Sequence, residues 1–189
     1  TNHVLNVCES RADSLGIIDL RGGFVPFTEN ANSEESRKGD VDTTIDNLRT
    51  RGANTSYGAC YYPWVLLKDT ISGASLWAPP SVAALGVLAS SQKRTELWFA
   101  PAGFTRGGLT EGAAGIPVIG INERLTSDQR DKLYAANINP IATFPAEGIV
   151  IFGQKTLQVT QSALDRINVR RMMNFIKKRI SKIASTTLF

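Results

Sequence analysis

Short apolar runs alternate with amphipathic segments along the whole chain, and this alternation limits the fold more than any other feature of the sequence. The runs are rich in β-branched and aromatic residues and are bounded by turn formers, as expected of strands. The segments between them repeat their apolar residues at helical spacing. This order favours an α/β fold, a layered sheet with helices packed on it, whose strand order the sequence does not determine.

Helix starts and ends are marked by capping residues. Asp40 or Asp42 supplies an N-cap for a short amphipathic helix that ends at Gly52, and Val41, Ile45 and Leu48 form its apolar face. A proline opens the next helix, whose apolar surface carries Val82, Leu85 and Leu88 among small residues that permit close packing. The predicted helices span residues 40–52, 79–94, 126–139 and 160–184.

The predicted strands lie between these helices. Pro63 within residues 57–69 indicates an edge position or a bulge, because proline cannot donate to a central ladder. Glu147 and Gly148 predict a hairpin turn. The polar stretch 30–40 predicts an exposed loop. Strands are expected within residues 15–22 and 57–69, at the start of the glycine-rich segment 96–117, and as one or two strands within residues 140–158.

Length and composition fit one soluble globular domain spanning residues 1–189. Hydrophobic residues make up 42% of the 189, enough for a core. No apolar run approaches the ~18–20 residues of a membrane helix, so no membrane insertion is expected, and the first residues do not resemble a signal peptide. Cys8 and Cys60 lie in apolar, strand-like contexts that predict buried reduced thiols and a cytosolic, reducing environment. The ends at Thr1 and Phe189 suggest a fragment of a longer protein.

Positive charge gathers in one segment. Residues 165–183 contain seven Lys and Arg residues against Asp165 alone, a local charge of +6 that leaves −2 for the rest of a chain whose formal total is +4. This concentration disfavours a nucleic-acid surface over the whole domain. It favours one cationic helix that faces an acidic partner.

The residues needed for catalysis or cofactor binding are missing. The glycine loop 103–115 has no Lys at the Walker position and does not match a dinucleotide fingerprint. His3, the single histidine, lacks companions at metal-ligand or triad spacing. The carboxylates Asp13, Asp19, Asp69 and Glu147 are scattered, which predicts surface solvation for most of them. We expect no enzyme activity, no metal and no nucleotide.

The final helix carries the candidate functional site. An apolar stripe is predicted to pack on the core, with a basic face opposite that points outward. For that face, docking of an acidic protein partner is favoured over plain solvation, and nucleic acid or an anionic membrane is less favoured because aromatic residues are not interleaved. The stripe comprises Val169, Met172, Met173, Ile176, Ile180 and Ile183, and the basic face comprises Arg170, Arg171, Lys177, Lys178 and Lys182.

Six ordered blocks carry a resemblance to a known family. They read CESRADSLGIID, NTSYGACYYPWV, APPSVAALGVLA, FAPAGFTRGGL, NINPIATFPAEGIVIFGQKTL and INVRRMMNFIKKRI, and together they span nearly the whole chain. In this order they resemble the C-terminal core of contractile tail sheath proteins of bacteriophages, with related sheaths in bacteriocins and other contractile injection systems. Lys155 stands where the family usually has Arg, which keeps the charge and loses bidentate hydrogen bonding.

The resemblance implies a structural role in a virion tail, for a protein made in the host cytoplasm. The parent protein is expected to form hexameric rings stacked around the tail tube and to drive the tube through the bacterial envelope by contraction, without a nucleotide. Its expected partners are other sheath subunits, the tail tube, the baseplate and the tail terminator. A sheath of a related injection system or bacteriocin is the alternative. The glycine-rich blocks are then packing framework, and the extended terminal arms of the family are absent, so this chain alone is expected to be monomeric.

Two hypotheses from other classes stay open at the sequence level. A hydrolase or transferase would need a pocket with convergent acids or bases near residues 103–115. A nucleic-acid-binding module would use the final helix and show steep salt dependence. For the sheath interpretation, we expect Arg170, Arg171, Lys177, Lys178 and Lys182 to meet acidic side chains of the tail tube.

Overall fold

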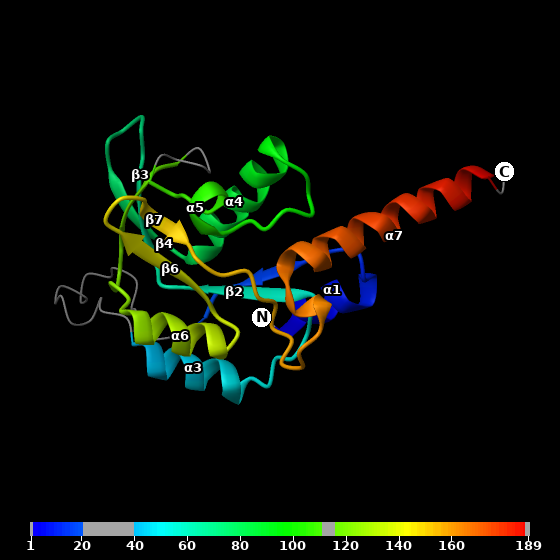
Figure 1. Cartoon of the computed structure of the whole chain (residues 1–189), viewed down its shortest axis with the longest axis horizontal. Helices are drawn as coiled ribbons and strands as arrows, with labels where there is room; N and C mark the ends of the chain where they lie inside the picture. Colours follow the sequence, from blue (N-terminus) through cyan, green and yellow to red (C-terminus); the bar gives the residue numbers. More distant parts are fainter. Residues whose placement is uncertain (1, 21–39, 111–115, 188–189) are drawn as a thin grey trace.

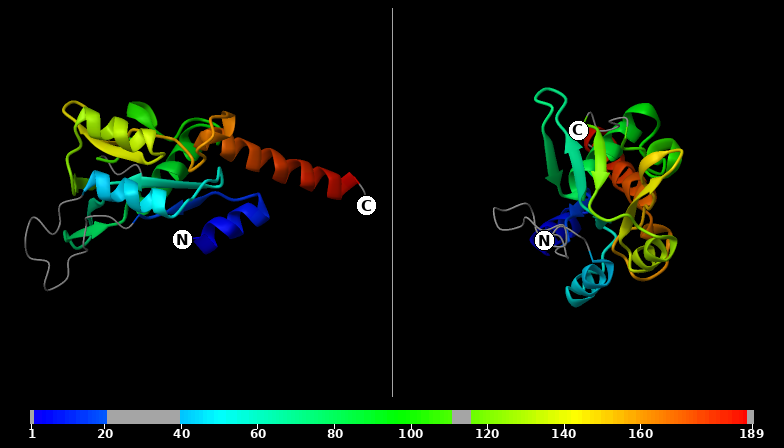
Figure 2. Two further views of the ribbon diagram at one scale, coloured as in Figure 1. Left: turned by 90° about the horizontal axis from the view of Figure 1, so that it is seen from below. Right: turned by 90° about the vertical axis from the view of Figure 1, so that its left-hand side faces the viewer.

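The computed structural model describes residues 2–20, 40–110 and 116–187. Two sheets and the helices around them form the body of the molecule, and the last helix projects away from it (Figures 1 and 2). The α/β fold with helices packed on sheets is confirmed. The helices are α1 (Asn2–Arg11), α3 (Val41–Thr50), α4 (Pro80–Arg94), α5 (Gly103–Arg106), α6 (Ser127–Ala135), the 3-10 helix η1 (Ala163–Asp165) and α7 (Ile167–Thr187).

The first sheet has the order β1-β2-β6-β7. Strands β1 (Gly16–Ile18), β2 (Gly58–Tyr62) and β6 (Asn139–Phe144) are parallel, and β7 (Gly148–Ile151) returns antiparallel to β6. The predicted hairpin at Gly148 is confirmed, and this glycine has a φ of +71° that favours glycine.

A second sheet differs from the expected pattern. Strand β3 (Val65–Lys68) pairs antiparallel with both β4 (Ser75–Ala78) and β5 (Val118–Ile121). The prediction of one strand over residues 57–69 is therefore wrong. Pro63, which follows a cis peptide bond, separates β2 from β3, and a proline without an N–H cannot extend the ladder of β2.

The two faces of the first sheet form two cores. On β2, Ala59 and Tyr61 point into a core with α4, while Cys60 and Tyr62 point into a core with α1, α3 and α6. In Figure 1, α4 lies above the sheet and α3 and α6 lie side by side below it. Because both faces are covered, all five residues of β2 are buried.

Residues at the first turn explain where three confirmed helices begin. The carboxylate of Asp40 accepts the N–H groups of Asp42 and Thr43 at the start of α3. Thr126 and Gln129 form a capping box on α6. Helix α4 begins with proline at its first turn, as predicted. The face that it turns toward the core is not the predicted surface of Val82, Leu85 and Leu88. The small residues Ala83, Ala84 and Val87 are buried there together with Leu88, whereas Val82 and Leu85 are exposed.

Other expectations are wrong. Residues 96–103 form no strand. Trp98 packs near Phe175 of α7, with ring centroids 6.2 Å apart. Cys8 lies on α1, which was not predicted, rather than in a strand.

Both cysteines are free and buried, as expected. The loop predicted at residues 30–40 lies outside the described residues except for Asp40. No helix of the described ranges is long and apolar enough to cross a bilayer.

Candidate functional site

Helix α7 meets the body through its polar side, which reverses the predicted orientation. Its buried residues are Ile167, Arg170 and Asn174, which share one face. Arg170 is only 4% exposed. Its guanidinium donates a hydrogen bond to the Ser56 hydroxyl and lies 3.9 Å from the centre of the Tyr57 ring. Arg170 therefore anchors α7 to the start of β2.

Arg171 is a second anchor rather than an outward charge. Its Nη2 donates to the Gln92 side-chain oxygen at 3.0 Å and to the carbonyl of Leu88 at 3.4 Å, both on α4. Burial lowers the pKa of Arg171. The prediction that Arg170 and Arg171 point outward is wrong, because the body packs against that side of the helix.

The next turn of α7 crosses the edge of the body. Lys177 Nζ donates to the Tyr57 hydroxyl at 3.2 Å, and Lys178 Nζ lies 3.7 Å from an Asp13 carboxylate oxygen. The pKa of Asp13 falls to about 2, chiefly through its hydrogen bonds with Arg11 and Ser14, with a smaller effect of Lys178. Lys182 lies further out and pairs with no carboxylate of the described chain.

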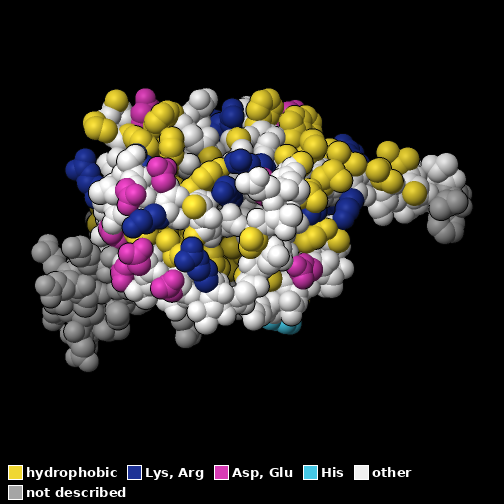
Figure 3. Space-filling model, turned by 60° about the horizontal axis from the view of Figure 1, so that its bottom comes forward, with side chains coloured by type: hydrophobic (Ala, Val, Ile, Leu, Met, Phe, Trp, Pro, Cys, Tyr) yellow, Lys and Arg dark blue, Asp and Glu magenta, His cyan; other side chains and the backbone are white. Residues whose placement is uncertain are grey.

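The apolar stripe of α7 faces away from the body. Val169, Met172 and Met173 are half-buried, but Ile176, Ile180 and Ile183 are 38%, 61% and 64% exposed. From residue 176 to 187 every side chain is exposed, because α7 extends past the end of the sheet (Figure 2). Figure 3 shows hydrophobic side chains along this projecting part with Lys and Arg beside them. The prediction that this stripe packs on the core is wrong.

The glycine loop is part of the sheet packing. Leu109 N–H donates to the carbonyl of Ile149 at 2.8 Å, and Ile151 N–H donates to the carbonyl of Gly107 at 2.9 Å. The segment thus covers the outer edge of β7. A Cβ on Gly107 would lie 2.4 Å from the Ile151 carbonyl oxygen, so the close approach requires glycine.

Two of the scattered carboxylates cap backbone groups instead of being merely solvated. Asp19 accepts the N–H of Ser81 at 3.1 Å and its hydroxyl at 2.7 Å, at the first turn of α4. Asp69 accepts the N–H of Ile71 at 2.9 Å in the β3–β4 turn. Within the described ranges, no three His, Cys, Asp or Glu residues lie together in a group able to hold a metal ion.

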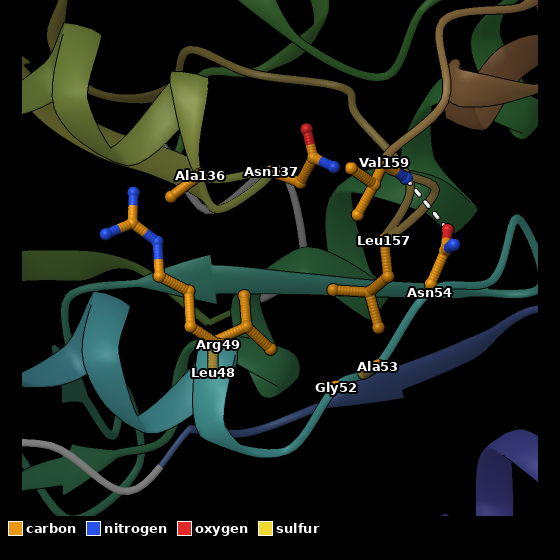
Figure 4. Close-up of a pocket in the computed structure, with 9 residues that line it drawn as sticks. All are labelled: Leu48, Arg49, Gly52, Ala53, Asn54, Ala136, Asn137, Leu157 and Val159. Atoms are coloured by element: carbon orange, nitrogen blue, oxygen red, sulfur yellow. Dashed lines mark hydrogen bonds between the residues drawn. The ribbon is translucent and has the colours of Figure 1, made fainter.

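A cavity of about 210 Å³ lies between α3, the end of α6 and the segment that follows β7 (Figure 4). Leu48, Ala53, Leu157 and Val159 line most of it, and Arg49 is the only titratable residue among the described residues of its wall. The lining offers apolar contact and one charge, without the paired acids or bases that general acid–base catalysis uses.

Lys155, the position where the resemblance expects Arg, binds the end of α6. Its Nζ donates to the carbonyl of Tyr134 at 2.9 Å and lies 4.3 Å from the centre of that ring. Burial, and next the nearby Arg166, lower the pKa of Lys155. A single ammonium donor is sufficient for this contact with a helix C-terminus.

No protein-family model matches the chain. Curated relatives do. The tail sheath protein of Vibrio phage KVP40 is 34% identical over 145 residues, and the tail sheath protein of Enterobacteria phage T4 is 32% identical over 190 residues. These alignments cover 77% and 99% of this chain but 20% and 28% of the relatives, so the chain spans less than a third of their length.

Solved structures share the fold. A chain of the anti-feeding prophage baseplate in the contracted state has a TM-score of 0.63 at 23% identity, over 96% of this chain and 44% of that chain. A chain of the contracted helical sheath of the same system has a TM-score of 0.58 at 28% identity, over 72% and 35%. The sequence placed the candidate site on α7, which stays a prediction. It did not indicate the contacts of α7 with Ser56, Tyr57 and Asp13, because the spacing of residues within α7 carries no information about them.

Proposed function

Because the chain belongs to the family of contractile tail sheath proteins, we propose that it is the core of a structural subunit that polymerises around the tail tube of a phage. The observation that carries this proposal is the match to the T4 tail sheath protein along 99% of the chain. In this proposal the subunits form hexameric rings, and the role is mechanical rather than enzymatic.

A phage tail is favoured over an injection system or bacteriocin. The phage relatives reach 34% and 32% identity, whereas the solved injection-system chains described above reach 23% and 28%. The protein is then made in the host cytoplasm and becomes part of the virion tail, where the baseplate and the tail terminator bound the sheath. Contraction releases energy by rearranging subunit contacts cooperatively, without a nucleotide.

We also propose that exposed cations of α7 face the tail tube in the extended sheath. Arg170 and Arg171 serve as anchors, so the contact falls to Lys182 and to Lys177 and Lys178, which hold their present partners only at the surface. Exposed ion pairs contribute roughly 0–1 kcal/mol each. Repeated over many subunits, such weak contacts hold a register on the tube and release together on contraction.

The full-length protein tests both proposals under the electron microscope. Alone it should form tubular polymers, and with tail tube it should form extended sheath. Lys182→Glu should prevent extended sheath on the tube and leave polymers without tube unchanged, while Lys93→Glu, an exposed change on α4, should alter neither. Failure of the wild-type protein to polymerise contradicts the structural role. Normal extended sheath from Lys182→Glu contradicts the tube contact alone.

A further inference from the structure

The start of α7 is fixed to the body through the backbone. Ile167 is fully buried in the core that contains α4, and its N–H donates to the carbonyl of Gln154 at 2.9 Å. Two residues earlier, the carbonyl of Asp165 accepts the N–H of Thr156 at 2.8 Å. These bonds tie the first residue of α7 to residues 154–156, which follow β7. The beginning of the helix therefore moves only when that segment moves.

Beyond Ile167, the described hydrogen bonds from α7 to the body come from side chains. They are donated by Asn168, Arg170, Arg171 and Lys177. The apolar residues of this part add less, since Val169, Met172 and Met173 are only half-buried. Burial of apolar surface is the main term that holds packed elements together. A helix that is docked mostly by polar side chains is therefore held less firmly than one docked by an apolar face.

The interface of α7 with the body also leaves polar atoms unsatisfied. Within the described residues, six buried side-chain nitrogen or oxygen atoms have no hydrogen-bond partner, and three of them belong to α7. They are Arg170 Nε, Arg171 Nη1 and Asn174 Oδ1. A buried polar atom without a partner costs free energy, which is recovered when the atom meets water. Because undocking returns all three atoms to water, their burial favours an open helix.

We propose that α7 undocks from the body as one unit, about a pivot at Ile167, while both sheets stay folded. Residues 176–187 are exposed already, so opening requires only the turns from residue 168 to residue 175 to leave the body. Such an element changes the direction of the projecting helix without rebuilding either core. The inference rests on the contacts of α7 with the body, and holds whether or not the chain surrounds a tail tube.

Hydrogen exchange of the chain, measured without urea and at low urea concentrations, tests the proposal. A single undocked helix of this length is marginal in water, so the amides of residues 171–173 exchange when α7 opens. They should exchange at least tenfold faster than the most protected amides of β2 and β6, and with a weaker dependence on urea, because opening exposes little surface. One common rate with one urea dependence overturns the proposal, because α7 then opens only on global unfolding.

A matched pair of variants tests the effect of the unsatisfied atoms. Asn174→Leu removes the buried Oδ1 atom and keeps a similar side-chain volume, so it should protect the amides of residues 171–173 about tenfold more than Asn168→Leu does. Asn168→Leu makes the same change in helix propensity, but it replaces an amide that already donates to the Trp98 carbonyl at 3.1 Å. Equal protection in the two variants, lower protection in Asn174→Leu, or loss of its fold overturns the proposal.

Discussion

Replacing Gly107 by alanine tests the packing role of the glycine loop. The φ of Gly107 is −93°, which alanine tolerates, so only the contact matters. The added Cβ would lie 2.4 Å from the Ile151 carbonyl oxygen and 2.8 Å from the Gly103 carbonyl oxygen, and backbone atoms cannot rotate away. The loop must therefore shift from β7, which breaks its two ladder hydrogen bonds, those of Leu109 with Ile149 and of Ile151 with Gly107.

Each lost hydrogen bond costs about 1 kcal/mol, and the backbone displacement adds about 1 kcal/mol, so the free energy of unfolding should fall by about 3 kcal/mol. For a chain of this size, the melting temperature should drop by about 6–12 °C. The drop in melting temperature is measured by thermal unfolding, with circular dichroism as the signal. Gly108→Ala is the matched control, since a Cβ there meets no atom within 4 Å. Equal melting temperatures for the two variants would refute the steric reasoning.

Three further predictions concern the anchoring of α7 and the core. Arg170→Ala should lower the free energy of unfolding by about 2 kcal/mol in urea titrations, because the charged hydrogen bond to Ser56 and the ring contact are lost; a change near zero would contradict the anchoring. The pKa of Asp13 is lowered to about 2, so its stabilisation is complete above the unfolded-state pKa near ~4 and is lost as the pH falls through about 2. The stability difference between wild type and Asp13→Asn should accordingly shrink between about pH 5 and pH 2, and a constant difference would count against the contacts with Arg11 and Lys178. Cys60 is fully buried and its thiol pKa is raised, chiefly by that burial, so it should react with a disulfide reagent only after denaturation; rapid native reaction would refute its place in the core.

The elements that follow local rules were predictable from sequence. Asp40, Thr126 and Gly148 fix helix starts and a hairpin through contacts within a few residues. The second sheet was not predicted. Pro63 is compatible with one bulged strand or with two separate strands, and only the pairing of β3 with β4 and β5 distinguishes them. Helix α1 was missed because it buries only Leu5 and Cys8, too few to give a period.

The sequence predicted the wrong side of α7 to face the body, and the choice of α7 as the candidate site stays a prediction. Periodicity divides α7 into two faces, but it does not say which face meets the body. The usual rule places the apolar face inside. Here Arg170 is accommodated by Tyr57 and Ser56, far away in sequence, and the isoleucine row extends past the end of the sheet.

Cryo-electron microscopy of polymers of the full-length protein tests the central claim most directly, because one map shows both the assembly and the surroundings of α7. We predict tubular polymers built from repeated copies of this fold, in which Arg170 of α7 keeps its contacts with Ser56 and Tyr57. A protein that stays monomeric at high concentration, or a polymer built from a different fold, would contradict the account.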